Sequence, residues 1–158
     1  TKSVTWTSNW LWGWALAIAP SAAWIGVTGD YGLEPFLLSL AVALWAGSFD
    51  ILYHTQDVEC QRGNNLNSVA TKFGVPAAFK ISKTLDIITV ITLTYLGMLM
   101  SLHFIYFVGC LVVSLLLVYK YKIVKPDDLS KLGMAFMRIN AFVSTSILIA
   151  TIFAIVIG

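Results

Sequence analysis

Five apolar segments follow one another along this chain of 158 residues. About 20 consecutive apolar residues are enough for a helix to cross the hydrocarbon core of a bilayer. Only 11% of the residues are charged, against about 25% in a typical soluble domain. A buried soluble core would explain one such segment, but not five in succession. The sequence therefore predicts an all-α integral membrane protein with five transmembrane helices. They are expected over about residues 9–28, 34–53, 77–101, 103–121 and 132–157.

The basic residues indicate how these helices are oriented. All ten lysines and arginines lie at or near the N-terminus, the connection 54–76 or the connection 122–131, which five alternating helices place on one membrane face. Because lysine and arginine accumulate on the cytoplasmic side, we expect the N-terminus and the connection 54–76 to be cytoplasmic. The C-terminus then lies on the opposite side of an inner, cytoplasmic membrane. The net charge of +2 is too small to suggest a nucleic-acid partner.

Polar residues concentrate in the segment DILYHTQDVECQR, residues 50–62. Asp50, His54, Asp57 and Gln61 are spaced by four, three and four residues. This pattern predicts that the helix that contains Asp50 continues through the next turns, which keeps the four residues on one face. Carboxylates on one face repel each other unless a cation lies between them. Oxygen ligands of this kind suit Mg²⁺, which commonly bridges protein carboxylates to a phosphate.

Spacing alone leaves three interpretations of this segment open. The first is a magnesium and phosphate site. The second is a solvated connection whose acids offset Arg62. The third is a transition-metal site that uses His54 together with Asp50 and Asp57.

The residue types add to what the spacing indicates. The segment 50–62, followed by Leu66, Ser68 and Lys-Phe-Gly at 72–74, resembles the second aspartate-rich motif of the UbiA superfamily of membrane prenyltransferases. The chain looks most like the bacterial 4-hydroxybenzoate polyprenyltransferases in this superfamily. Three further segments look like parts of the same family: TKSVTW at 1–6, APSAAWIGVTG at 19–29 and FMRINAFVS at 136–144. The resemblance thus extends over essentially the whole chain.

The resemblance implies a fold of nine membrane helices, of which these five would be the last. Two aspartate-rich motifs would face each other at the cytoplasmic side and hold Mg²⁺, which binds a polyprenyl diphosphate. The reaction implied is transfer of the polyprenyl group to an aromatic acid such as 4-hydroxybenzoate, a step of ubiquinone or menaquinone biosynthesis. The prenyl tail would lie in an apolar tunnel that opens toward lipid.

The same resemblance implies roles for individual residues. Asp50 and Asp57 match the first two acids of the motif and would be catalytic metal ligands, and Gln61 stands where a third acid is usual. Tyr53 matches a tyrosine that would line the cavity, although a packing role explains it equally well. The residues that match diphosphate-binding basic positions are Lys2, Arg62 and Lys72. Each of these basic residues could instead be an anchor at the membrane interface.

Three polar residues inside the apolar helices have two interpretations each. Asp86 either forms a local ion pair with Lys83 or Lys80, or lines the cavity and contacts the acceptor. Arg138 and Asn140 either make hydrogen bonds between helices or also line the cavity.

Three departures from the family pattern bear on activity. Gln61 can offer a carbonyl oxygen but no negative charge, and Ser3 stands where an arginine is usual. The first aspartate-rich motif would precede Thr1, so we expect the chain to be part of a longer polypeptide. Two functions follow: part of a Mg²⁺-dependent prenyltransferase that needs the N-terminal half of the same protein, or a non-catalytic subunit of a membrane complex that binds quinone, pigment or lipid.

Overall fold

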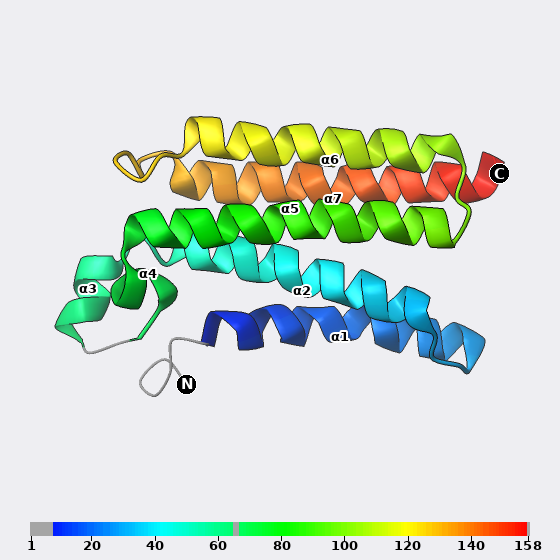
Figure 1. Cartoon of the computed structure of the whole chain (residues 1–158), viewed down its shortest axis with the longest axis horizontal. Coiled ribbons are helices and arrows are strands. Elements are labelled where there is room, and N and C mark those ends of the chain that lie inside the picture. Colours follow the sequence, from blue (N-terminus) through cyan, green and yellow to red (C-terminus); the bar gives the residue numbers. More distant parts are fainter. Residues whose placement is uncertain (1–7, 65–66, 158) are drawn as a thin grey trace. The chain divides into compact units, whose positions relative to one another are not determined.

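A computed structural model describes residues 8–64 and 67–157, with the side chains of residues 8–12, 59, 62 and 134–136 left out of the description (Figure 1). No β-strand forms in these ranges. Their helices are α1 (Ser8–Thr28), α2 (Leu33–Tyr53), α3 (Val58–Gly63), α4 (Val69–Phe73), α5 (Val75–Leu99), α6 (Phe104–Ile123) and α7 (Leu132–Ile157). The predicted all-α fold is confirmed.

Four helices of the described chain are long and apolar enough to cross a membrane: α2, α5, α6 and the Met137–Ile157 part of α7. The apolar part of α1, Gly13–Thr28, is shorter. The long helices follow the predicted ranges closely, because apolar run length sets them. The largest differences are that α5 runs from Val75 to Leu99 instead of from 77 to 101, and that α6 ends at Ile123 instead of 121. The chain is therefore an integral membrane protein built from helices.

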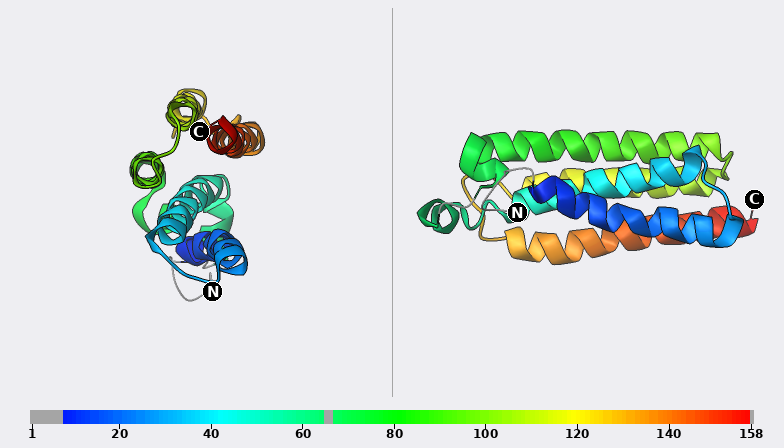
Figure 2. Two further views of the ribbon diagram at one scale, coloured as in Figure 1. Left: turned by 90° about the vertical axis from the view of Figure 1, so that its right-hand side faces the viewer. Right: turned by 90° about the horizontal axis from the view of Figure 1, so that it is seen from below.

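The chain divides into two compact units, Thr1–Thr89 and Val90–Gly158, with the border inside α5. In the first unit α1 and α2 lie side by side (Figure 2). A Cβ atom on Gly13 would lie 2.5 Å from the carbonyl oxygen of Ala43, so only glycine permits this approach. The hydroxyls of Ser21 and Ser39 form a hydrogen bond of 2.6 Å between the same two helices.

The core of the first unit joins α2 to the short helices α3 and α4 and to the start of α5. Its buried members are Leu44, Ile51, Val58, Val69, Ala70, Ala78 and Leu85. A capping box starts α4, because the Ser68 hydroxyl accepts the Thr71 N–H while the Thr71 hydroxyl accepts the Ser68 N–H. Gly74 follows α4 with φ +85°, a value that favours glycine. These contacts hold the connection 54–76 against the end of α2.

The second unit contains the rest of α5 together with α6 and α7. The ring of Tyr106 on α6 lies against Gly97 on α5, and its hydroxyl donates to the carbonyl of Leu93 at 3.0 Å. Gly109 on α6 faces the Cβ of Ala150 on α7. Small residues therefore set the distances between these helices, as is common in membranes.

Candidate functional site

The acidic segment is not one continuous helix, and that prediction was wrong. α2 ends at Tyr53, residues 54–57 form turns, and α3 begins at Val58. The Thr55 N–H bonds the Leu52 carbonyl at 3.0 Å and its hydroxyl donates to the same oxygen at 2.6 Å, which tightens the last turn. Val58 is buried in the core, so packing of α3 stabilises the break.

The break gives the four spaced residues different surroundings. Asp57 is exposed, whereas His54 and Gln61 are buried, at 8% and 7% exposure. The Asp50 side chain is 16% exposed. The prediction that all four share one face is therefore wrong for Asp57, because this residue lies in the turns at 54–57 that separate α2 from α3.

Asp50, His54 and Gln61 form a linked set. The Nδ1 atom of His54 lies 3.7 Å from Oδ1 of Asp50, one helical turn earlier. The Nε2 atom of Gln61 donates to the backbone carbonyl of His54 at 3.4 Å. Gln61 Oε1 is buried and has no hydrogen-bond partner among the described residues. The amide therefore lies against the His54 backbone just after α2, and its oxygen is a buried acceptor.

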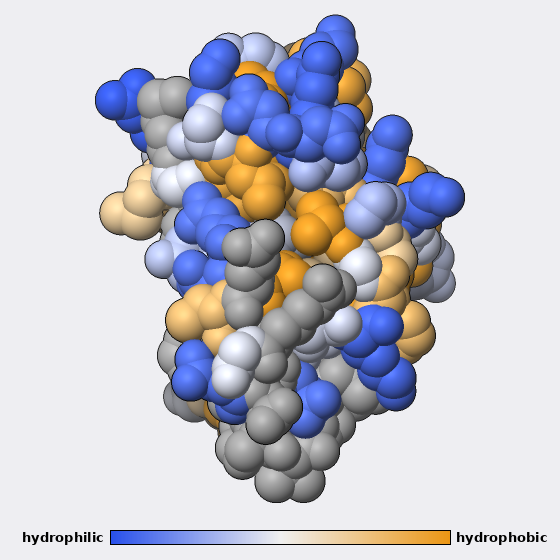
Figure 3. Space-filling model, turned by 90° about the vertical axis from the view of Figure 1, so that its left-hand side faces the viewer, coloured by the Kyte–Doolittle hydropathy of each residue, from blue (hydrophilic) through white to orange (hydrophobic). Residues whose placement is uncertain are grey.

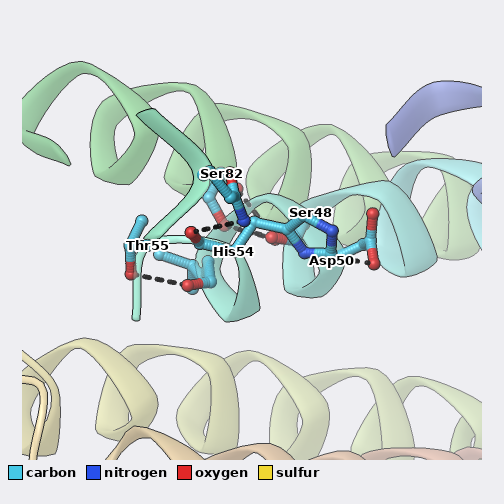
Figure 4. Close-up of polar contacts among 7 residues, drawn as sticks. Ser48, Asp50, His54, Thr55 and Ser82 are labelled. Atoms are coloured by element: carbon cyan, nitrogen blue, oxygen red, sulfur yellow. Dashed lines mark hydrogen bonds and ion pairs between the residues drawn. The ribbon is translucent and has the colours of Figure 1, made fainter. Parts of the chain in front are cut away.

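Two serines join α2 to α5 next to this set (Figure 4). The Ser82 hydroxyl donates to the Ser48 carbonyl at 2.8 Å, and the two hydroxyl oxygens are 2.7 Å apart. Both residues are fully buried at 0% exposure. Ser48 precedes Asp50 by two residues, so the pair fixes the end of α2 against α5 where the polar set begins.

The donor atoms fit a magnesium ion in part. Among the residues with described side chains, no three His, Cys, Asp or Glu groups lie together as a metal site. Asp50 and the unbonded Gln61 oxygen are nevertheless oxygen donors of the kind that Mg²⁺ uses. Mg²⁺ usually keeps several waters and needs only one or two carboxylates plus substrate phosphates, so a small protein donor set is sufficient.

Two further predicted site residues near this end of the first unit, Tyr53 and Lys72, are exposed. Tyr53 ends α2 at 40% exposure, and its ring centroid lies 6.2 Å from that of His54. Lys72 is exposed in the last turn of α4, and its Nζ lies 5.3 Å from the centre of the Phe73 ring. Lys2 and the side chain of Arg62 lie outside the described residues. Figure 3 views the molecule from the end where α3 and α4 lie, and hydrophilic side chains gather there.

The remaining predicted cavity residues occupy different surroundings. Asp86 on α5 is only 3% exposed, whereas Lys80 and Lys83 are exposed. In the second unit, Arg138 is exposed, and Oδ1 of Asn140 is buried without a hydrogen-bond partner in the described part of the chain. Their assignment to a cavity stays a prediction.

Comparison with known proteins identifies the family of this chain. The sequence profile of the UbiA prenyltransferase family matches residues 1–145. This chain belongs to the UbiA prenyltransferase family. A 4-hydroxybenzoate octaprenyltransferase of Pasteurella multocida (strain Pm70) is 29% identical over 143 residues, which are 90% of this chain and 47% of that protein. The chain thus spans about half the length of this curated relative. No solved structure matches it.

Membership in the UbiA family confirms the resemblance found in the sequence. Sequence reasoning missed Ser48 and Ser82, because single serines in apolar runs carry no recognisable spacing. The available signal was their position, two residues before Asp50 and four before Asp86. In this chain these hydroxyls hold α2 against α5 two residues before Asp50.

Proposed function

We propose that this chain is the C-terminal part of an aromatic prenyltransferase. It would transfer a polyprenyl group from an isoprenoid diphosphate to an acid such as 4-hydroxybenzoate in quinone biosynthesis. The observation that carries the proposal is the buried, unbonded Gln61 oxygen at the turn that follows Asp50, in the segment of this UbiA-family chain that resembles the second aspartate-rich motif. The activity printed in the name of the Pasteurella relative supports the same reaction class.

In this proposal Asp50, Asp57 and Gln61 would hold a divalent ion. When bound, Mg²⁺ neutralises the charge that develops on the departing diphosphate. Lys72, Arg62 and Lys2 contact the diphosphate oxygens as fixed cations. The diphosphate leaves with the electron pair of the C–O bond, the ring carbon beside the phenol bonds to the allylic carbon, and that ring carbon then loses its proton.

The proposal also assigns roles to the lipid-facing helices and to Asp86. Lipid-facing helices accommodate the polyprenyl tail. Asp86 is a buried carboxyl in a membrane helix. Burying an ionisable group there costs free energy, so acids at such positions commonly have a function. We assign it to contact with the polar groups of the aromatic acceptor. The first aspartate-rich motif would come from a preceding segment of the same protein or from another subunit, on the cytoplasmic side.

The test is prenyl transfer from a polyprenyl diphosphate by the complete gene product that contains this chain. We expect Asp50→Asn to lower the rate by about 100-fold or more, because charge stabilisation at the leaving group is lost. Asp127→Asn is the matched control, since this acid is exposed in the connection between α6 and α7, and it should leave the rate unchanged. Equal rates for both variants would rule out the metal assignment.

A non-catalytic membrane subunit is the second candidate. The exposure of Asp57 and the neutral Gln61 favour it, because both weaken a metal site built on three acids. Absence of prenyl transfer by the complete gene product, together with retained binding of a quinone or lipid, would establish this alternative.

A further inference from the structure

The connection between α6 and α7, with the helix ends on either side of it, is strongly basic. Residues 120–138 carry five of the chain's ten lysines and arginines but only two of its eight acids, which gives this segment a net charge of +3. The whole segment belongs to the second unit. Half of the basic residues are thus gathered at one end of the α6–α7 pair. They are Lys120, Lys122, Lys125, Lys131 and Arg138.

The connection is a fixed turn. The Lys125 N–H donates to the Asp128 carbonyl at 3.3 Å, and the Asp128 N–H donates to the Lys125 carbonyl at 3.1 Å, which closes the turn across the two residues between them. Val124 before the turn is 1% exposed and Leu132 after it is 2% exposed. Buried apolar residues therefore anchor the turn on both sides, and its side chains have defined positions at the helix ends.

One of the two acids is already engaged within the turn. Asp128 Oδ1 accepts hydrogen bonds from the hydroxyl and the N–H of Ser130, at 2.6 and 3.1 Å. These bonds, and after them the charges of Lys131 and Lys125, hold the pKa of the carboxyl below its usual value. The two lysines are thus close enough for their charges to act at the same carboxylate, so the turn brings together bases from both sides of the connection.

The bases lie at the ends of two membrane spans. Lys122 is in the last turn of α6, and Arg138 is the second residue of the apolar span Met137–Ile157. Lipid phosphates lie just outside the hydrocarbon core, where lysine and arginine side chains at span ends reach them. Lys120 is buried. The four exposed bases, here called the basic surface, are Lys122, Lys125, Lys131 and Arg138.

We propose that the basic surface binds the headgroup of an anionic phospholipid. The lysine ammonium groups attract the phosphate as point charges, and the Arg138 guanidinium can donate two parallel hydrogen bonds to it. Tyr119 is 54% exposed and lies one turn before Lys122, which places an aromatic ring where tyrosine is common at membrane interfaces. The inference goes beyond the proposed function, since no substrate of prenyl transfer takes part in it.

Native mass spectrometry of the complete gene product in detergent tests this proposal without any substitution. The protein is titrated with phosphatidylglycerol or with phosphatidylcholine, and the fraction that carries one lipid gives the affinity for each. We expect phosphatidylglycerol to bind more tightly, because only its headgroup has a net negative charge. Glycerol 3-phosphate at the same concentration should not displace it, because this soluble phosphate has no acyl chains to lie along the apolar helices.

The double variant Lys125→Gln/Lys131→Gln assigns the preference to the basic surface. Both lysines are exposed and outside the helices, so the fold should be retained. We expect the affinity for phosphatidylglycerol to fall by about 5-fold or more, with little change for phosphatidylcholine. Lys80→Gln/Lys83→Gln is the matched control, because it removes the same charge from two exposed lysines of α5, and it should have little effect.

Several outcomes would overturn the proposal. Equal affinity of the unsubstituted protein for the two lipids would show that the bases only orient the helices. Full displacement by glycerol 3-phosphate would show that the surface takes a soluble phosphate compound instead. Retained affinity in Lys125→Gln/Lys131→Gln, or an equal loss in both double variants, would show that the preference does not arise at the α6–α7 connection.

Discussion

Two helix pairs of this membrane protein are held by different contacts. Between α2 and α5, the buried hydroxyls of Ser48 and Ser82 bond across the helices. Between α6 and α7, Gly109 lies against Ala150, and the nearby Ser114 hydroxyl bonds a carbonyl of its own helix at 2.8 Å. The first pair is also the less apolar in sequence, with mean hydropathies of 1.7 and 1.3 against 2.0 and 2.2 for the second.

The two pairs differ in whether polar side chains contribute to the contact between the helices. In lipid, helices associate through close packing of small residues or through polar side chains. The α6–α7 contact uses packing between small residues. The α2–α5 contact uses hydroxyls, and Ser48 lies two residues before Asp50. The two pairs therefore reach close contact by different means.

The largest expected effect concerns the α6–α7 contact. A Cβ atom at Gly109 would overlap the Cβ of Ala150, whereas a Cβ at Gly133 has no neighbour within 4 Å. Gly109→Ala should therefore lower the free energy of unfolding by about 1–3 kcal/mol. Gly133→Ala should raise it by about 0.5–1 kcal/mol, because alanine favours the helix. Unfolding by SDS in mixed micelles, followed by circular dichroism, measures both. Equal changes in the two variants would contradict the packing account.

A smaller effect is expected at the serine pair. Ser48→Ala and Ser82→Ala should each lower the free energy of unfolding by about 0.6 kcal/mol, the average for polar contacts between membrane helices. Each single variant retains one hydroxyl near a carbonyl of the facing helix, so the double variant should lose about the sum. Ser114→Ala, which removes a bond within one helix, is the control and should change little. No loss in the double variant would show that the pair does not hold the helices.

The smallest effect on stability is expected in the connection between α6 and α7, where a hydroxyl mainly changes the ionisation of a carboxyl group. The Ser130 hydroxyl and N–H donate to Asp128 Oδ1 at 2.6 and 3.1 Å, and they hold the pKa of Asp128 below its usual value. The stability linked to this depressed pKa is present above the unfolded pKa and is lost as the pH falls through the folded pKa.

Ser130→Ala should raise the Asp128 pKa part of the way toward its usual value, because the backbone N–H remains. An NMR titration of the carboxyl carbon measures the shift. Circular dichroism at neutral pH should show only a slight loss of stability, because Asp128 is exposed and the linked contribution is small. A large loss of stability would mean that the connection is more than a solvated turn.

The long helices could be predicted because the length and composition of an apolar run determine a membrane helix. The motif could be recognised from Asp50, Asp57 and the residues around them. The break at 54–57 could not, because four-three-four spacing is also that of a helix, and the turn depends on Thr55 and on burial of Val58. The serine contact depends on the approach of two helices distant in sequence, which no local pattern encodes.

The carboxyl of Asp86 also bears on biogenesis. Among the four spans found in the described chain, α5 has the lowest mean hydropathy, 1.3 against 1.7–2.2 for the others. An aspartate at the centre of a helix costs about 2.5–3.5 kcal/mol on insertion by the translocon. α5 is thus the segment that partitions least readily into lipid alone. We therefore expect α5 to enter the membrane together with neighbouring helices, so that insertion and assembly are coupled at this helix.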